Sequence, residues 1–261
     1  MAKHEKTMII ESGDQLFQPA TRREFLRLLG IGGGLMLMPS VFAACSNNDN
    51  PVAPRPTALS LDLSNDTGIL NYAYALEQLE AAYYTAAITS PGYAALSANE
   101  KEVIDDLQKH EVIHREFFKT VLGSAAIPTI QFNATTVASL VANRDVLLKT
   151  SQLLEDTGVS AYNGAGKYLS SKANLLVAGK IVSVEARHAA AIRDMRDTTG
   201  KLFAGDDVVD ANGLDVKADP GTVLTAVSGL NVIDTTKNTI AIGTQPSRTA
   251  ATPDKTAPTP A

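Results

Sequence analysis

Two short motifs of the chain combine a glutamate with a histidine three residues later. They are Glu111-Val-Ile-His114 and Glu185-Ala-Arg-His188. Residues three apart lie one turn apart on the same face of an α-helix, so each motif places a carboxylate beside an imidazole. This pair of ligand types suits iron or manganese. Only three histidines lie beyond residue 44, and the chance that two of them fall in this pattern by accident is below about 1%.

Two further glutamates interrupt apolar helical faces, and each is followed seven residues later by a tyrosine. The pairs are Glu77 with Tyr84 and Glu155 with Tyr162. The chain therefore repeats one unit, a segment with Glu and Tyr followed by a segment with Glu-x-x-His. An unpaired buried carboxylate costs several kcal/mol, so four of them in one core require a compensating cation. Two divalent metal ions would balance the four negative charges.

Two neighbouring residues offer alternative ligands. Glu80 lies one turn from Glu77 on the same segment, but the repeated seven-residue spacing favours Glu77 and leaves Glu80 beside the ligands or facing solvent. His110 lies one turn before His114 and could replace it. The second unit has Val184 at the equivalent place, which favours an outer or partly exposed position for His110.

Helical periodicity and the positions of the prolines place these residues on four segments. The segments are about 66–88, 97–122, 144–169 and 172–196. The first two are joined by a short turn, and so are the last two. Roughly twenty residues separate the second segment from the third, which is long enough to cross the length of a bundle. Two helical hairpins joined by a long crossover predict an all-α fold, a four-helix bundle.

The chain resembles the ferritin-like di-metal carboxylate superfamily, and in particular the exported ferritin-like domain proteins of bacteria that are described as desiccation-related. The resemblance covers about residues 66–198. It rests on four stretches, which are 70–84, 110–114, 154–162 and 184–188. It implies a ferritin-like bundle with two divalent metal ions, iron in the first place and manganese as the alternative.

The resemblance also implies a role for each site residue. Glu77 and Glu155 would be ligands contributed singly by their helices, Glu111 and Glu185 would bridge the two ions, and His114 and His188 would supply nitrogen. No catalytic residue is implied beyond the metal ligands. Tyr84 and Tyr162 would either hydrogen-bond a ligand carboxylate or simply fill the core.

The first 44 residues are interpreted as an export signal of the twin-arginine type. Arg22 and Arg23 precede a short, glycine-interrupted apolar stretch, Leu28–Met38. The Phe-Ala-Ala-Cys sequence that ends at Cys45 resembles a bacterial lipobox, which would make Cys45 a lipidated membrane anchor. Cleavage before an unmodified cysteine is the alternative. Either way we expect an exported protein, periplasmic or tethered in the cell envelope.

The segments around the bundle carry fewer signals. Residues 45–65 hold the lipobox cysteine and are expected to be a flexible tether. Residues 199–243 form a C-terminal extension in which about 219–230 could be one short helix. Residues 244–261 are rich in proline, threonine and alanine, which is typical of a disordered tail.

Composition excludes several function classes. The chain has 23 Lys and Arg against 28 Asp and Glu, a net charge of −5, and no long basic run, so nucleic acid is not expected as a partner. A single cysteine excludes a four-cysteine zinc site and an internal disulfide.

The preferred functional hypothesis is an exported di-iron protein that oxidises Fe(II) or reacts with oxygen or peroxide in envelope stress protection, with a catalase-like reaction if the metal is manganese. Its partners would then be a small-molecule oxidant or Fe(II), the membrane through Cys45, and a second copy if it forms a homodimer. The alternative is a non-catalytic, desiccation-associated envelope scaffold or binding protein whose metal is structural or absent. Iron storage in a cage fits less well with an anchor and a proline-rich tail.

Overall fold

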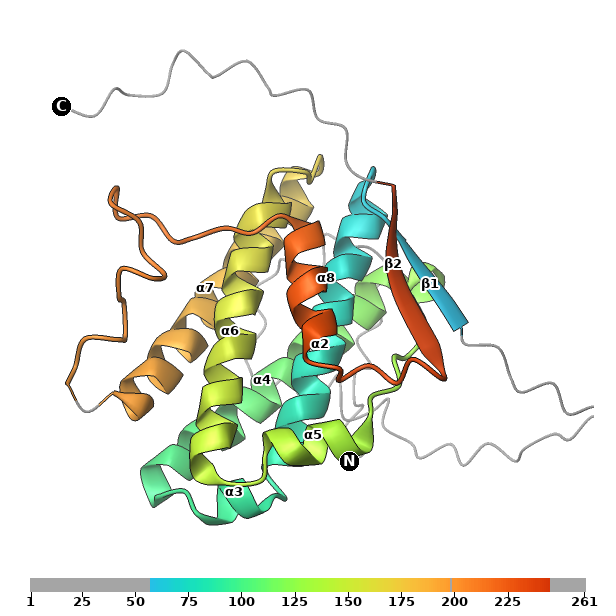
Figure 1. The fold of residues 1–261 in the computed structure, drawn as a ribbon. Coiled ribbons are helices and arrows are strands. Elements are labelled where there is room, and N and C mark those ends of the chain that lie inside the picture. Colours follow the sequence, from blue (N-terminus) through green and yellow to red (C-terminus); the bar gives the residue numbers. More distant parts are fainter. Residues whose placement is uncertain (1–56, 198, 245–261) are drawn as a thin grey trace, which may run out of the picture. The chain divides into compact units, whose positions relative to one another are not determined.

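The computed structural model describes residues 57–197 and 199–244. Four long helices dominate this part of the chain (Figure 1): α2 (Asp66–Ala87), α4 (Ala98–Leu122), α6 (Arg144–Gly166) and α7 (Lys172–Arg196). Helix α2 packs along α4, and α6 packs along α7. The predicted all-α bundle of two hairpins is confirmed. None of the described helices is both long and apolar enough to cross a membrane. The predicted export signal, Cys45 and residues 245–261 lie outside the described residues.

Each long helix begins at a polar residue whose side chain accepts a hydrogen bond from the first turn. These capping residues are Asn65, Ser97, Asn143 and Ser171. At α4 the cap is reciprocal, because Glu100 N donates to Ser97 Oγ (3.4 Å) and Ser97 N donates to Glu100 Oε2 (2.8 Å). Such caps satisfy backbone donors that the helix leaves free, so they fix where each helix starts.

Glu100 also joins the first turns of two helices. Its Oε1 accepts a hydrogen bond from Arg144 Nε (3.1 Å) at the start of α6. The hydrogen bond from Arg144 holds the pKa of Glu100 near 2, below its usual range. A carboxylate with a lowered pKa in the folded state stabilises the fold above its unfolded pKa, and this contribution is lost as the pH falls towards 2.

Replacing Glu100 with Gln is expected to lower the free energy of unfolding of the metal-free protein by about 1 kcal/mol at pH 7, because Arg144 is partly exposed and solvent screens the pair. The difference should shrink as the pH falls from about 4.5 to about 2. Urea denaturation at pH 7 and pH 3 measures both values. A deficit that does not change with pH, or an equal deficit in the exposed control Glu102→Gln, would contradict this role.

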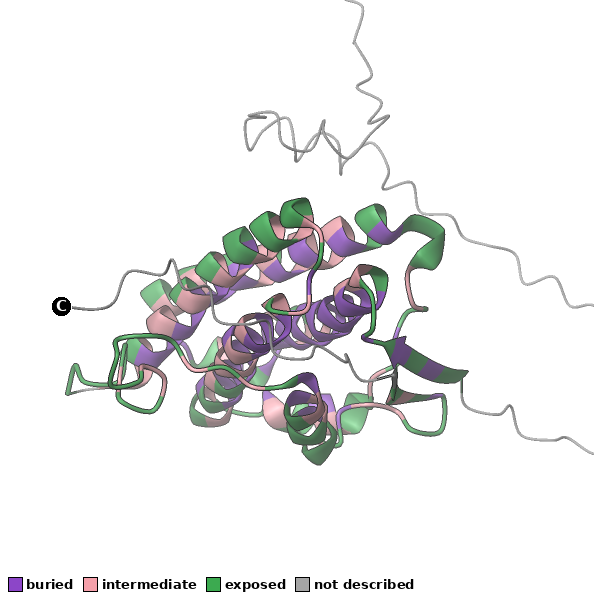
Figure 2. Cartoon of the chain, turned by 90° about the horizontal axis from the view of Figure 1, so that it is seen from above, coloured by how far each residue is buried: buried purple, intermediate pink, exposed green. Residues whose placement is uncertain are grey.

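The middle of helix α2 is buried on every side. Residues 71–81 are all buried, and buried residues gather on the inner faces of the helices in the view from above (Figure 2). The crossover, which contains the 3-10 helix η2 (Gly123–Ala125) and α5 (Ala134–Leu140), runs past α2. Its backbone is held by α2 side chains: Asn71 accepts from Ile127 N and Gln78 accepts from Ile130 N, both at 2.8 Å.

The prediction of a flexible tether over 45–65 is wrong in its last part. Residues Thr57–Asp62 form strand β1, which pairs in parallel with β2 (Asn238–Thr244). The strand is held in place by two leucines. Leu59 and Leu61 are 5% and 1% exposed, and their side chains pack in the core with residues of α2. Strands this far apart in the sequence carry no local pairing signal.

The C-terminal extension completes the cover of the bundle. Helix α8 (Pro220–Gly229) agrees with the helix predicted near 219–230, and Val223 and Val227 on α8 join the core that includes α2. Strand β2 extends to Thr244, so the first residue of the predicted tail belongs to a strand. One further short helix, α3 (Pro91–Ala94), lies in the turn between α2 and α4.

Candidate metal centre

Each of the four long helices contributes one glutamate to the middle of the bundle. Glu77 comes from α2, Glu111 from α4, Glu155 from α6 and Glu185 from α7, and all four side chains are 0% exposed. Each glutamate lies on the stripe of its helix that otherwise carries apolar residues, so helix packing alone directs the carboxylates towards one another.

The six predicted ligands form two overlapping groups. One group contains Glu77, Glu111, His114 and Glu185, and the other contains Glu111, Glu155, Glu185 and His188. Within each group, one ligand atom of every residue lies within 4.8 Å of the others. Two of the glutamates belong to both groups, so each group is a four-residue site that shares two carboxylates with its neighbour.

The shared glutamates turn one oxygen to each histidine. His114 Nδ1 lies 2.8 Å from Glu185 Oε1 and 3.5 Å from Glu111 Oε2. His188 Nδ1 lies 3.0 Å from Glu111 Oε1 and 3.6 Å from Glu185 Oε2. This is the arrangement that two bridging carboxylates require.

The other two glutamates each serve one side only. Glu77 Oε2 lies 3.4 Å from His114 Nδ1, and Glu155 Oε2 lies 3.3 Å from His188 Nδ1. The two halves of the centre are therefore related by an approximate twofold axis, in agreement with the repeat in the sequence.

The ligand atoms at the centre lack hydrogen-bond partners. Among the described residues, ten buried side-chain atoms have no hydrogen bond, and eight of them belong to the six predicted ligands. The contacts above are short but do not have hydrogen-bond geometry. Buried polar atoms are normally satisfied, so eight unsatisfied nitrogen and oxygen atoms that converge on one place fit a pair of bound metal ions.

The two tyrosines cross between the hairpins to hold the unshared glutamates. Tyr84 Oη on α2 donates to Glu155 Oε1 on α6 (2.6 Å), and Tyr162 Oη on α6 donates to Glu77 Oε1 on α2. Burial, with the charge of Glu155, raises the pKa of Tyr84 well above its usual value, so its hydroxyl keeps the proton that it donates. Each bond leaves the second carboxylate oxygen, Oε2, facing the centre.

Comparison with known protein families matches residues 65–198 to the ferritin-like domain family. The chain belongs to this family. The matched residues contain all four long helices and all six predicted ligands, and ferritin-like domains bind di-metal centres with such a ligand set. No curated protein matches the chain.

His110 supports one ligand of this ferritin-like centre from outside. Its Nδ1 lies 2.9 Å from His188 Nε2, within hydrogen-bond distance, and the two rings are stacked at an angle of 11°. The contact occupies the ring nitrogen of His188 that faces away from the glutamates, so it orients Nδ1 towards them. His110 is only half-buried and does not belong to either ligand group, as the repeat with Val184 indicated.

Electrostatics at the ferritin-like centre favour positive charge. Burial, with the charge of Glu185, raises the pKa of Glu111 to about 8, and burial raises the pKa of Glu155 to about 7. Burial alone would lower the pKa of His188, but the charge of Glu155 and contacts with the neighbouring glutamates raise it to about 12. The cluster therefore attracts cations, whether protons or metal ions.

Glu80 is buried as well, which excludes the solvent-facing position that the sequence left open. It is 2% exposed and lies outside both ligand groups. Burial, and then the charges of the four ligand glutamates, raise the pKa of Glu80 well above its usual value. Of the two positions that the sequence left open for Glu80, beside the ligands or facing solvent, its burial favours the first.

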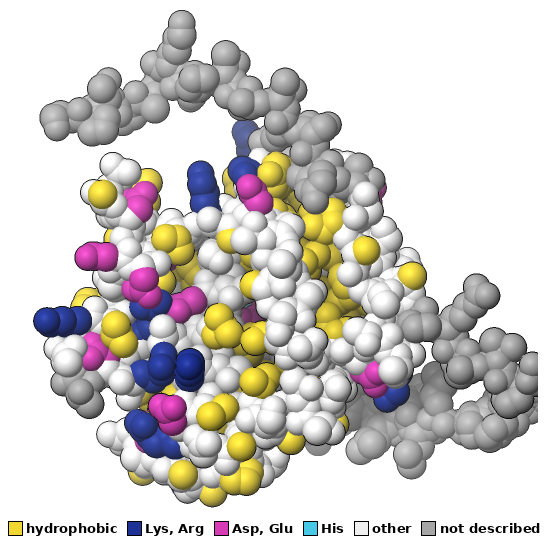
Figure 3. Space-filling view, in the orientation of Figure 1, with side chains coloured by type: hydrophobic (Ala, Val, Ile, Leu, Met, Phe, Trp, Pro, Cys, Tyr) yellow, Lys and Arg dark blue, Asp and Glu magenta, His cyan; other side chains and the backbone are white. Residues whose placement is uncertain are grey.

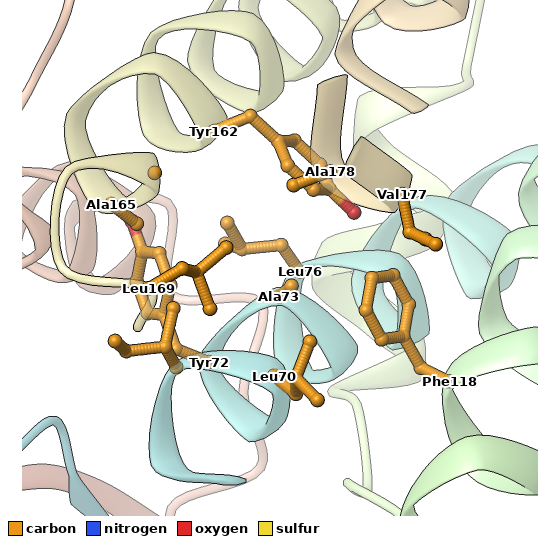
Figure 4. Close-up of a pocket in the computed structure, with 12 residues that line it drawn as sticks. Leu70, Tyr72, Ala73, Leu76, Phe118, Tyr162, Ala165, Leu169, Val177 and Ala178 are labelled. Atoms are coloured by element: carbon orange, nitrogen blue, oxygen red, sulfur yellow. The ribbon is translucent and has the colours of Figure 1, made fainter. Parts of the chain in front are cut away.

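A small apolar cavity of about 20 Å³ lies between the side chains labelled in Figure 4. Side chains from α2, α4, α6 and α7 line it, and Tyr162, which holds Glu77, forms part of its wall. On the face of the described residues drawn in Figure 3, charged side chains of both signs are interspersed and no histidine is visible. The cavity thus offers a small apolar molecule a place beside Tyr162, whose hydroxyl holds the ligand Glu77.

Proposed function

We propose that this ferritin-like protein holds two divalent metal ions, iron in the first place and manganese as the alternative, and oxidises Fe(II) or reacts with dioxygen or peroxide. The observation that carries the proposal is the convergence of eight unpartnered ligand atoms from four helices. A core that served only as a scaffold would gain stability from apolar residues at these positions.

The ligand glutamates differ in how many carboxylate oxygens they present to the centre. Glu111 and Glu185 each have one oxygen on either side and would bridge the ions. Glu77 and Glu155 would each bind through Oε2, because a tyrosine holds Oε1. His114 and His188 would supply one nitrogen each. Bound Fe(II) ions would each supply one electron, and the two electrons together would reduce dioxygen or peroxide.

The surrounding residues restrict what reaches this chemistry. Tyr84 and Tyr162 keep protons at Glu155 Oε1 and Glu77 Oε1, and among the described residues theirs are the only hydroxyl groups that hydrogen-bond a ligand. The apolar cavity at Tyr162 is of a size for a diatomic molecule rather than an organic substrate. The size and apolar lining of this cavity support dioxygen as the oxidant.

We also propose that the protein works outside the cytoplasm, as an envelope protein tethered through a lipid on Cys45. The twin-arginine motif, Arg22 and Arg23, and the lipobox-like sequence before Cys45 support this location. Removal of Fe(II) or peroxide there would protect the envelope under stress, including desiccation.

Anaerobic loading with two Fe(II) per chain, followed by addition of oxygen or peroxide, tests the reaction. We expect wild-type protein and the exposed control Glu102→Ala to form Fe(III) at least about tenfold faster than the Glu111→Ala/Glu185→Ala variant. Equal rates in all three proteins would contradict an oxidase. Two ions that bind without being oxidised would favour the scaffold with a structural metal.

A further inference from the structure

Glu80 is a fifth buried glutamate in the middle of the bundle. It is 2% exposed, and within residues 57–197 and 199–244 its carboxylate makes no hydrogen bond or ion pair. An unpaired carboxylate at this depth destabilises a fold by several kcal/mol. Helix α2 therefore carries a buried carboxyl group, with a pKa raised well above its usual value, that the six ligands described above do not explain.

Glu80 also breaks the symmetry of the two halves. Glu77 and Tyr84 on α2 correspond to Glu155 and Tyr162 on α6, and the residue that corresponds to Glu80 is Gly158. The missing side chain matters, because a Cβ atom at Gly158 would lie 3.1 Å from Glu80 Oε1 and 3.7 Å from Oε2. The carboxylate of Glu80 thus fills the space that Gly158 leaves free.

The carboxylate of Glu80 lies near one ligand glutamate from each half of the centre in the helical sequence. It lies against Gly158 of α6, one turn from Glu155, while its own helix carries Glu77 one turn away. The same two helices exchange the tyrosine bonds to Glu77 and Glu155. The Glu80 carboxylate therefore lies between α2 and α6, and it is coupled electrostatically to all four ligand glutamates.

We propose that Glu80 is a fifth carboxylate of the metal centre, and that it enables the centre to hold a trivalent cation in addition to a divalent one. This inference rests on the proposed metal-binding function. Four carboxylates balance two divalent ions, with a total charge of +4, whereas five balance a total of +5. The approximate symmetry of the site is broken by one unit of negative charge, and the ligand class that this charge selects is a small trivalent metal ion.

Zinc(II) and gallium(III) test the proposal without any change of oxidation state. We expect the purified wild-type chain to bind two zinc ions, and Glu80→Gln to bind them with an affinity within about threefold of wild type. Gallium, supplied as its citrate complex, should bind to Glu80→Gln about tenfold more weakly or worse. The exposed Glu102→Gln variant on α4 is the matched control and should bind both ions like wild type.

A second variant perturbs the Glu80 carboxylate through a substitution on α6, the helix opposite. Gly158→Ala keeps Glu80 but places a methyl group against its Oε1, so it should also weaken gallium binding more than zinc binding. Both variants should fold, since Glu80→Gln replaces a buried carboxyl group with an amide of similar shape and alanine favours a helix more than glycine does. The metal-free Glu80→Gln protein should melt at or above the wild-type temperature.

The outcomes separate this proposal from the one on which it rests. An unchanged preference for gallium over zinc in Glu80→Gln, or an equal loss of both ions, would overturn the role of Glu80 while leaving the two-ion centre in place. Failure of the wild-type chain to bind zinc at all would overturn the metal centre itself, and this proposal with it.

Discussion

The Glu111→Ala/Glu185→Ala variant is expected to lose both metal ions, whereas the single variants Glu77→Ala and Glu155→Ala should each lose about one. The first two glutamates present an oxygen to both ligand groups, while the other two serve one group each. Elemental analysis of protein purified from cells supplied with iron or manganese measures the metal content per chain.

This graded loss distinguishes bridging from unshared ligands. Glu102→Ala, exposed on α4, controls for the loss of a glutamate and should keep the wild-type content. Circular dichroism confirms that each variant is helical. A double variant that retains two ions, or single variants that lose both equally, would contradict the assignment of bridging glutamates.

Removal of the metal ions is expected to lower Tm by about 10 °C. Ligands that bind only the folded state at a thousand times their Kd stabilise it by about 4 kcal/mol, and each kcal/mol shifts Tm by about 2–4 °C in a domain of this size. In this protein the loss is reinforced because the four ligand glutamates, each 0% exposed, are left close together with only protons to balance their charge. Thermal melts with and without a chelator measure the shift.

The control for this experiment is a variant that lacks the two glutamates common to both ligand groups. Glu111→Leu/Glu185→Leu should show no response to the chelator, and its Tm should exceed that of metal-free wild type, because apolar residues replace buried charges. If wild type and this variant respond alike to the chelator, the stabilising metal lies elsewhere.

The four helices could be predicted from sequence because their signals are local. Capping residues such as Ser97, together with a regular apolar stripe, fix α4 and α7 nearly to the residue. Strands β1 and β2 could not be predicted in the same way. Their pairing joins Leu59 to Ile240 across most of the chain, and no local pattern encodes such a contact.

The ligand set was visible in the sequence because each ligand repeats at a fixed helical spacing. The finer geometry depends on the neighbouring helix. Tyr84 holds a glutamate of α6 rather than one of its own helix, and Glu80 is buried because Gly158 opposite it has no side chain. These contacts depend on how the helices pack against one another, and helix packing cannot be predicted from the local pattern of a single sequence.

Anomalous X-ray scattering from crystals of the iron-loaded protein tests the central claim most directly. We expect two iron peaks between Glu111 and Glu185, one next to His114 and the other next to His188. Peaks outside this cluster, or a fully loaded protein with no peak between the two shared glutamates, would contradict a di-metal centre in this bundle.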